Sequence, residues 1–287
     1  MSSSKRPVVA QTKAKVNLYL HITGKRDDGY HLLDSLVAFA NCGDEIALDP
    51  GAAFAVEIDG PFAAQVDSRP DLVEKTVRRM TECFGQPLDF TVRVTKNLPV
   101  AAGIGGGSGD AALMIRLLCK RWALSLDDPA LKALAAELGA DVPVCLAGKA
   151  AFVDGVGERF YPALGMPNLP AVLVNNGQGV STPAVFKAYG GGFRDPDRAQ
   201  ILPRQPKAMA ALLADRTNVL ENAALTVEPG IRRVLDALGG TNPLLARMSG
   251  SGGTCFALFD TIADAERAAE AISASHPDWW VRACTLA

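Results

Sequence analysis

The chain has 287 residues, of which 48% are hydrophobic and 21% are charged, and its formal net charge is −2. This length predicts one large domain or two of ordinary size, with enough apolar residues for a sizeable core. The small net charge and the lack of a basic run argue against a nucleic acid or a membrane surface held by bulk electrostatics.

The six cysteines and three histidines are scattered along the chain, with no C-x-x-C pair and no zinc-ligand spacing. We therefore expect reduced thiols rather than disulfides. Lys13 and Lys15 interrupt any signal-peptide core, and the longest uncharged stretch, 160–186, contains four prolines. Because neither a leader nor a membrane span is expected, the prediction is a cytoplasmic protein, a monomer or weak homodimer.

The first regular segment is a strand over residues 14–22. Apolar residues alternate there with Lys15, Asn17, Tyr19 and His21. A period of two is typical of a strand that has one face in the core. Lys15 and Asn17 then project from the same face of this strand.

Helices and strands of both kinds follow along the chain. After a loop at 24–31, the N-terminal half is expected to contain strands at 44–49 and 88–99, helices at 70–85, 110–124 and 128–139, and a hairpin at 149–163. Beyond a Pro/Gly-rich seam at 162–170, we expect strands at 171–176, 253–260 and 279–286, helices at 181–189, 206–215, 218–225, 230–240 and 261–275, and a mobile loop at 190–206. The predicted class is mixed α+β in two lobes.

Residues 98–113, LPVAAGIGGGSGDAAL, place five glycines directly before a helical pattern. They match neither a P-loop, since no lysine follows the glycines, nor a dinucleotide fingerprint, since Ser108 stands at the third glycine position. A strand, a glycine-rich turn and a helix still aim several backbone N–H groups at one point, which favours a bound phosphate. The alternative is a flexible turn capped by Ser108 or Asp110.

Three segments resemble the motifs of the GHMP kinases (galactokinase, homoserine, mevalonate and phosphomevalonate kinases). They are AKVNLYLHITGKRDDGYHLLDSL at 14–36, PVAAGIGGGSGDAA at 99–112 and MSGSGGTCFALF at 248–259. The first, with GADVP at 139–143, STPAVFK at 181–187 and NVLENAA at 218–224, is similar to the 4-diphosphocytidyl-2-C-methyl-D-erythritol kinase family. The similarity covers nearly the whole chain in order.

This resemblance implies a two-lobed GHMP kinase fold of the α+β class, with an N-terminal ribosomal-protein-S5-like domain and a C-terminal ferredoxin-like domain. The ATP-binding domain would span residues 1–165 and the second domain residues 166–287. The implied activity is ATP-dependent phosphorylation of the 2-hydroxyl of 4-diphosphocytidyl-2-C-methyl-D-erythritol in non-mevalonate isoprenoid precursor biosynthesis. ATP and Mg²⁺ are the implied cofactors, with the metal ligands unassigned.

By the same resemblance, Lys15 and Asp141 are the catalytic residues. Asp141 would orient the substrate hydroxyl and accept its proton late, because a carboxylate with an ordinary pKa of about 3.9 cannot form a free alkoxide. Lys15 would neutralise charge on the transferring phosphoryl group. Without the resemblance, Asp141 would be a helix N-cap and Lys15 a surface lysine. The implied ATP-binding residues are Pro99, Val100, Ala101, Ala102, Gly103, Ile104, Gly105, Gly106, Gly107, Ser108 and Gly109.

The resemblance also implies five substrate-binding residues. Tyr30 would stack on the cytosine base and His31 would pair with its edge. Asn17 would contact the polyol or phosphate region, while Thr182 and Phe186 would close the site from the second lobe. The residues alone leave lid packing open for Tyr30 and His31, and helix capping or core packing for Thr182 and Phe186.

Three positions depart from the patterns of some relatives. Where those have GGGSSNAA, this chain has GGGSGDAA, so Gly109 lacks a hydroxyl and Asp110 replaces an amide. Asp110 would repel a polyphosphate unless it caps the helix while pointing away or helps to organise Mg²⁺. Val37 stands where some relatives have an aromatic residue.

Other functions stay open from the sequence alone. A GHMP kinase for homoserine or mevalonate is one, although neither acceptor carries a base for Tyr30 to stack on. A catalytically inactive nucleotide-binding sensor is another, although such a protein needs neither Lys15 nor Asp141. A nicotinamide oxidoreductase fits the motifs least.

Overall fold

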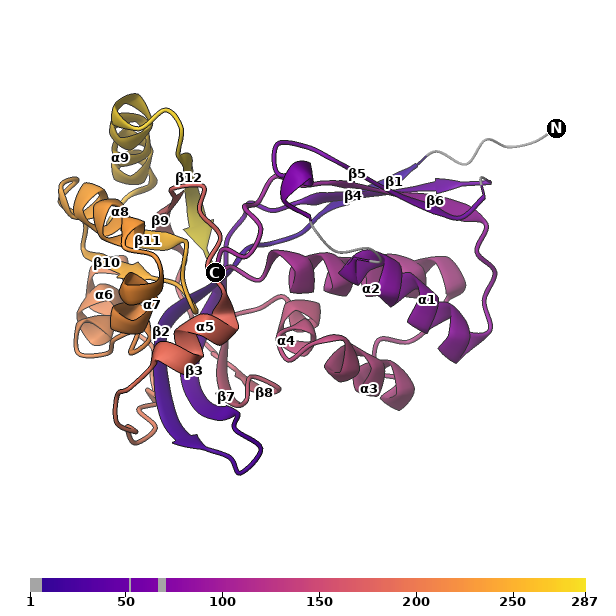
Figure 1. Cartoon of the computed structure of the whole chain (residues 1–287), viewed down its shortest axis with the longest axis horizontal. Helices are drawn as coiled ribbons and strands as arrows, with labels where there is room; N and C mark the ends of the chain where they lie inside the picture. Colours follow the sequence, from indigo (N-terminus) through magenta and orange to yellow (C-terminus); the bar gives the residue numbers. More distant parts are fainter. Residues whose placement is uncertain (1–6, 52, 67–70) are drawn as a thin grey trace. The chain divides into compact units, whose positions relative to one another are not determined.

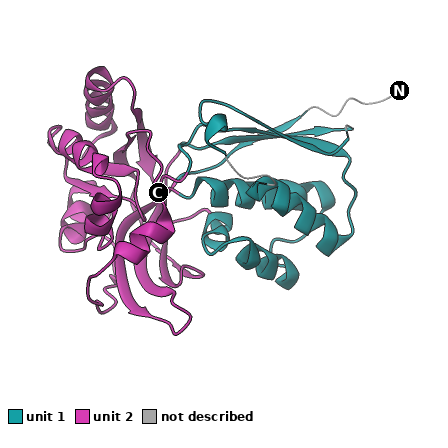
Figure 2. Ribbon diagram, viewed as in Figure 1, with its two compact units in different colours: residues 1–14, 42–100, 105–147 teal, residues 15–41, 101–104, 148–287 magenta. Residues whose placement is uncertain are grey.

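The computed structural model describes residues 7–51, 53–66 and 71–287 (Figure 1). They form two compact units that are interleaved along the chain (Figure 2). Unit 1 comprises residues 1–14, 42–100 and 105–147, and unit 2 comprises residues 15–41, 101–104 and 148–287. The domain boundary near residue 165 stays a prediction.

Unit 1 packs helices against one four-stranded sheet. The strand order is β1 (Val8–Gln11), β4 (Glu45–Pro50), β6 (Phe90–Thr95) and β5 (Ala55–Asp59), and only the β5–β6 pair is parallel. The helices are η1 (Ala63–Gln65), α1 (Leu72–Phe84), α2 (Gly106–Trp122), α3 (Pro129–Leu138) and α4 (Val142–Ala147). Figure 1 shows α1 and α2 side by side on one face of the sheet.

Local sequence explains why these elements form. Phe90, Val92 and Val94 are buried on β6, as the alternation predicts. Helix α1 begins after Asp71, whose carboxylate accepts the backbone N–H of Glu74 at 2.8 Å. It ends at Gly85, whose φ of +62° only glycine adopts readily, as the sequence predicts.

Unit 2 contains two antiparallel four-stranded sheets. The first has the order β2 (Lys15–Lys25), β3 (His31–Phe39), β7 (Ala151–Gly155) and β8 (Arg159–Pro162). The second has the order β10 (Leu245–Met248), β11 (Cys255–Leu258), β9 (Leu169–Asn175) and β12 (Trp280–Leu286). The helices are α5 (Thr182–Ala188), α6 (Pro206–Ala214), α7 (Glu221–Val227), α8 (Gly230–Gly239) and α9 (Ile262–Ser275).

The expected strand at 14–22 is confirmed as β2, but its expected exposed face is wrong. Lys15, Asn17, Tyr19 and His21 are all buried. The Tyr19 hydroxyl lies 3.2 Å from the Asp34 carboxylate, and Nε2 of His21 accepts the N–H of Thr217 at 3.3 Å, whereas Nδ1 of His21 is buried without a partner among the described residues. A bulge between Asn17 and Tyr19 also breaks the simple alternation.

The largest differences from the expectation concern one loop, the start of one helix and three short strands. The loop at 24–31 is shorter, because β2 runs to Lys25 and β3 starts at His31. Helix α2 starts at Gly106 rather than Asp110, so most of the glycines lie in its first turn. Strands β1, β5 and β10, each of four or five residues, were not predicted.

The expected loop after residue 189 is confirmed as irregular, and its mobility stays a prediction. The segment 190–205 contains no helix or strand. None of the six cysteines, all of which lie in the described residues, forms a disulfide. Within the described residues, no helix is long and apolar enough to cross a membrane.

Candidate active site

Lys15 and Asn17 meet at the start of β2, in the interior of unit 2. The Lys15 ammonium lies 3.4 Å from the side-chain oxygen of Asn17, and both residues are at most 6% exposed. The Asn17 amide donates a 2.8 Å hydrogen bond to the hydroxyl of Ser35 on β3. The amide orientation is thereby set, with its oxygen directed at the ammonium. This pair matches the expectation that the two residues project the same way.

Backbone and side-chain hydrogen bonds join the glycine-rich stretch to β2 and to the turn at 249–253. The Lys15 N–H donates to the carbonyl of Ile104 at 2.9 Å. The Ser249 hydroxyl donates to the carbonyl of Gly103 at 3.1 Å and accepts the N–H of Asn17 at 3.1 Å. Thus three segments that are far apart in the sequence, and that each carry a GHMP-like motif, are bonded directly to one another within unit 2.

Gly103 must be glycine for packing reasons. Its φ is +71°, and an added Cβ would lie 2.6 Å from the carbonyl oxygens of Ser249 and Gly252. The backbone of the stretch therefore touches the backbone of the second turn with no side chain between them. This contact explains one of the five glycines without any ligand.

The glycines at the start of α2 are different. Gly106 and Gly107 have ordinary helical φ, and an added Cβ would meet nothing closer than 3.7 Å at the first and 3.9 Å at the second. A helical glycine costs about 1 kcal/mol relative to alanine, so packing within unit 1 gives no reason for either. Bare backbone at a helix N-terminus, with N–H groups that have no intrahelical acceptor, suits an anion such as phosphate.

The alternative for this stretch, a turn capped by Ser108 or Asp110, is wrong. The N-cap residue is Gly105, with φ +65° and no side-chain cap hydrogen bond, rather than Ser108 or Asp110. Asp110 is 3% exposed and lies 2.6 Å from the ammonium of Lys96. Its carboxyl therefore points into the unit and away from the helix start.

Lys96 is shared between two acids. Its ammonium also pairs with Asp44, whose other carboxylate oxygen accepts the N–H groups of Asn97 at 2.6 Å and Leu98 at 2.8 Å. One cation thus faces two carboxyl groups in a buried site. Burial, followed by the nearby charge of Asp44, raises the pKa of Asp110 well above its usual range, although Lys96 opposes the shift. A protonated Asp110 makes this cluster neutral.

The expected base-binding residues lie at the tip of the β2–β3 hairpin in unit 2. Tyr30 is 64% exposed. The imidazole of His31 stacks on the ring of Phe186 from α5, with the centroids 5.3 Å apart and the planes at 26°. Burial, then the charge of Lys25, lowers the pKa of His31, which favours a neutral imidazole.

Thr182 and Asp141 each occupy a helix start. The Thr182 and Ser251 hydroxyls lie 2.6 Å apart, so α5 is joined to the second glycine-rich turn. Asp141 directly precedes α4 in unit 1, and its carbonyl accepts the N–H of Cys145 at 3.0 Å. That backbone position is the one of an N-cap residue, as the sequence predicts.

Several residues of this region were not anticipated. Ser249 lies inside a motif that the sequence singles out, but nothing in the sequence indicates that its hydroxyl links the other two motifs. In the sequence, Lys96 lies at the end of a predicted strand and Ser35 is one small residue among apolar ones, so neither is singled out. Their partners are 146, 14 and 18 residues away in the chain, and local patterns do not report such contacts.

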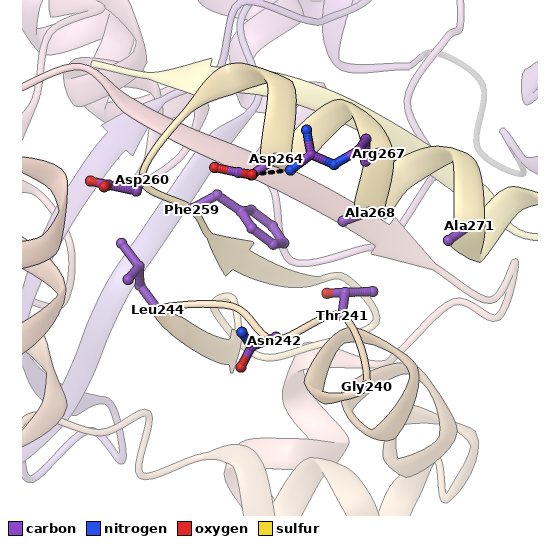
Figure 3. Close-up of a pocket in the computed structure, with 10 residues that line it drawn as sticks. All are labelled: Gly240, Thr241, Asn242, Leu244, Phe259, Asp260, Asp264, Arg267, Ala268 and Ala271. Atoms are coloured by element: carbon purple, nitrogen blue, oxygen red, sulfur yellow. Dashed lines mark hydrogen bonds and ion pairs between the residues drawn. The ribbon is translucent and has the colours of Figure 1, made fainter.

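A separate pocket of about 460 Å³ lies in unit 2 between α8, β11 and α9 (Figure 3). Figure 3 shows its charged side chains Asp264 and Arg267 directed at each other, and they form an ion pair. The residues that line it include none of those expected to bind ATP or substrate. Within the described ranges, no group of three or more His, Cys, Asp or Glu residues could hold a metal ion.

Comparisons with known proteins agree with the motifs. The chain matches the GHMP kinases N terminal domain over residues 71–149 and the GHMP kinases C terminal domain over residues 202–278. It is 46% identical to the 4-diphosphocytidyl-2-C-methyl-D-erythritol kinase of Paramagnetospirillum magneticum (96% of this chain, 97% of the relative). It is 47% identical to the protein of the same name from Dinoroseobacter shibae (98% of this chain, 96% of the relative). A crystal structure of 4-(cytidine 5'-diphospho)-2C-methyl-D-erythritol kinase, 33% identical, superposes with a TM-score of 0.77 over 97% of this chain and 99% of that one.

Proposed function

The chain belongs to the 4-diphosphocytidyl-2-C-methyl-D-erythritol kinase family of the GHMP kinases, and from this membership we propose that it phosphorylates the 2-hydroxyl of 4-diphosphocytidyl-2-C-methyl-D-erythritol at the expense of ATP. Relatives with that name cover nearly the whole chain, which favours this acceptor over homoserine or mevalonate and an enzyme over an inactive sensor. The reaction belongs to non-mevalonate isoprenoid precursor biosynthesis. The observation that carries the proposal is the direct hydrogen bonding of the three motif segments through Lys15, Asn17, Gly103, Ile104 and Ser249.

The stretch from Pro99 to Gly109 is the proposed ATP-binding segment. The exposed Gly107, which carries no side chain in the first turn of α2, supports a close approach of the triphosphate to backbone N–H groups. Mg²⁺, when bound, would neutralise charge on the transferring phosphoryl group. Since no protein cage for a cation occurs among the described residues, we propose that Mg²⁺ is held largely by the nucleotide phosphates.

Asp141 and Lys15 are the proposed catalytic residues. Asp141 orients the 2-hydroxyl and accepts its proton as the new O–P bond forms, while the β–γ bridging bond of ATP breaks. Lys15 stabilises the negative charge that develops on the phosphoryl oxygens. The Asn17 oxygen, 3.4 Å from the Lys15 ammonium, supports this role because it restrains the direction of the cation.

The cytidine end of the acceptor is the proposed ligand of the β2–β3 hairpin tip. The 64% exposure of Tyr30 leaves its ring available for stacking on a base. Stacking of His31 on Phe186 supports a fixed imidazole that pairs with the base edge. Thr182 and Asn17 are the proposed contacts to the remainder of the acceptor.

The test is ADP release by the purified protein with ATP, Mg²⁺ and one of three acceptors: the cytidylylated methylerythritol, homoserine or mevalonate. We expect turnover with the first acceptor alone, and a loss of about a hundredfold or more in Asp141→Asn, the order of a general-base contribution. Asp128→Asn is the matched control, because Asp128 also precedes a helix and accepts the N–H of Ala130 at 2.8 Å.

Asparagine caps helices as well as aspartate does, so both variants should fold. If both variants lose the same fraction of ADP release, the catalytic role of Asp141 is refuted. Turnover of another acceptor would be consistent with a GHMP kinase but would refute the base-binding roles of Tyr30 and His31. ATP binding without turnover of any acceptor would favour the sensor.

A further inference from the structure

We propose that Ser35, on β3, is a positioning residue for the phosphoryl transfer: its hydroxyl orients the side-chain amide of Asn17, and the amide oxygen directs the ammonium of Lys15. This inference rests on the proposed function, because it concerns the cation that would stabilise the transferring phosphoryl group. It assigns a role in the reaction to a small serine that lies on the neighbouring strand.

The hydrogen of the Ser35 hydroxyl is already used. The hydroxyl oxygen lies 2.5 Å from the carbonyl oxygen of Tyr19 on β2. Two oxygens at this distance share a hydrogen atom, and only the hydroxyl has one to give. Because Ser35 is 1% exposed, this bond is shielded from solvent. The Ser35 oxygen can therefore only accept a second hydrogen bond.

This restriction leaves the amide of Asn17 one orientation. A side-chain amide has a donor end and an acceptor end of similar shape, and its neighbours decide which end faces them. The end that faces Ser35 lies 2.8 Å from the hydroxyl oxygen and must donate, so it is the NH2 group. The amide oxygen then faces the Lys15 ammonium at 3.4 Å. The reverse orientation would place an NH2 group against an ammonium, and neither of these can accept a hydrogen bond.

The bulge in β2 between Asn17 and Tyr19 gives the physical reason for a hydroxyl at position 35. A bulge locally interrupts the ladder of backbone hydrogen bonds. Here side chains donate to two successive carbonyls: the guanidinium of Arg247 to that of Leu18 at 2.7 Å, and the hydroxyl of Ser35 to that of Tyr19. The serine thus holds both the backbone beside Asn17 and its amide.

Ser35→Ala removes the acceptor of the Asn17 NH2 group and leaves the amide orientation unselected. The Lys15 ammonium then loses a directed partner, which matters most when charge develops on the phosphoryl group. With ATP and the cytidylylated acceptor, kcat is expected to fall about tenfold, the order of one lost hydrogen bond. KM for ATP should stay unchanged, because the surface of α2 proposed for the triphosphate is untouched. Ser35→Thr keeps the hydroxyl and should retain most of kcat.

Thr76→Val is the matched control for the loss of a buried hydroxyl. Thr76 is 0% exposed, and its hydroxyl donates to the carbonyl of Leu72 at 2.7 Å. The control should change the thermal midpoint alone and leave kcat as in the wild type. If Ser35→Ala also keeps the wild-type kcat, the proposal is overturned.

A double-mutant cycle with Asn17→Ala tests whether Ser35 acts through Asn17, and it does not depend on the folding of Ser35→Thr. Residues that act through each other are not additive. Once Asn17 is alanine, Ser35→Ala should lower kcat by less than about twofold, because the amide that it orients is gone. The same tenfold loss in both backgrounds would overturn the proposal and indicate a structural role for Ser35.

The ammonium signal of Lys15 in ¹⁵N–¹H NMR spectra, assigned with Lys15→Met, gives a readout that needs no turnover. We expect this signal to shift or broaden in Ser35→Ala and to stay in place in Thr76→Val. An unchanged signal in Ser35→Ala would overturn the proposal. A wild-type protein that phosphorylates no cytidylylated acceptor would refute the proposed function, and the Lys15 signal would then decide separately whether Ser35 positions the ammonium.

Discussion

Two glycine-rich segments of this chain look alike in sequence but have different reasons for their glycines. At 249–253 the glycines are needed by the fold: Gly250 has φ +57°, and an added Cβ would lie 2.7 Å from the carbonyl of Gly103. At 105–109, Gly106 and Gly107 have helical φ, and a Cβ added to either would make only ordinary contacts, no closer than 3.7 Å. A glycine that the fold does not need suggests that a ligand approaches the backbone there. By this criterion, the segment at 249–253 is a packing turn and the start of α2 is a candidate ligand-binding surface.

The supports of the two segments also differ. The turn at 249–253 rests on neutral hydrogen bonds, such as those of the Ser249 hydroxyl and the 3.1 Å bond between Asn175 and Thr254. The start of α2 is supported by charged side chains. Gly106 lies next to Asp44, and both Asp44 and Asp110 pair with the ammonium of Lys96. We therefore expect pH and charge changes to affect the first turn of α2 far more than the second segment.

The largest expected effect comes from Lys96→Met, which leaves two buried carboxyl groups without their cation. Removal of one partner of a buried ion pair costs about 3–5 kcal/mol, so the free energy of unfolding by urea should drop by that amount. The double variant Lys96→Met/Asp110→Asn should recover part of the loss, because it removes one of the two acids. A Lys96→Met protein with wild-type stability would show that the cluster does not support α2.

Gly250→Ala should destabilise the second segment without any ligand. Alanine there needs a left-handed φ and meets backbone, and strain of this kind costs about 1–3 kcal/mol. Gly239→Ala is the control, since nothing lies within 4 Å of its Cβ position and its φ is not positive. Thermal unfolding of the two variants measures the contrast, and equal midpoints would contradict it.

Gly107→Ala should separate stability from binding. Alanine is about 0.8–1.0 kcal/mol better than glycine inside a helix, so the unfolding midpoint should rise slightly. The methyl group would stand on the surface proposed for the triphosphate, and KM for ATP should rise about tenfold, equivalent to about 1.4 kcal/mol. If the variant is stabilised but its KM for ATP is unchanged, the triphosphate does not bind at this turn.

The sequence predicts the elements around the two glycine-rich segments, but not why each segment has its glycines. The strands, the helices and the helix ends at Gly85 and Gly139 follow from local periodicity and capping. The glycine count at 98–113 correctly marks a special place. Which of those glycines are needed for packing depends on contacts with residues about 150 positions away, as at Gly103, and no local pattern contains them.

The role of Asp110 shows the same limit at the candidate site. From the sequence it looks like a helix cap or an aid to Mg²⁺, because the acid stands beside a phosphate-binding turn. Its partners Lys96 and Asp44 come from the end of β6 and the start of β4, and only the fold brings them beneath α2. By contrast, the pairing of Lys15 with Asn17 follows from strand alternation alone.

The smallest expected effect is the pH dependence of Asp110→Asn. In the folded protein the pKa of Asp110 is raised above the value of an unfolded aspartate, about 3.9. Its contribution to stability is therefore complete below that value and is lost as the pH rises toward the raised pKa, because the folded state keeps a proton that the unfolded state releases. An asparagine resembles the protonated acid and does not titrate. The wild-type protein should lose stability relative to Asp110→Asn as the pH rises from 5 to 9, measured by urea unfolding at each pH. If the difference between the two proteins stays constant, Asp110 is ionised in the folded state and the cluster beneath α2 carries a negative charge that would oppose the triphosphate.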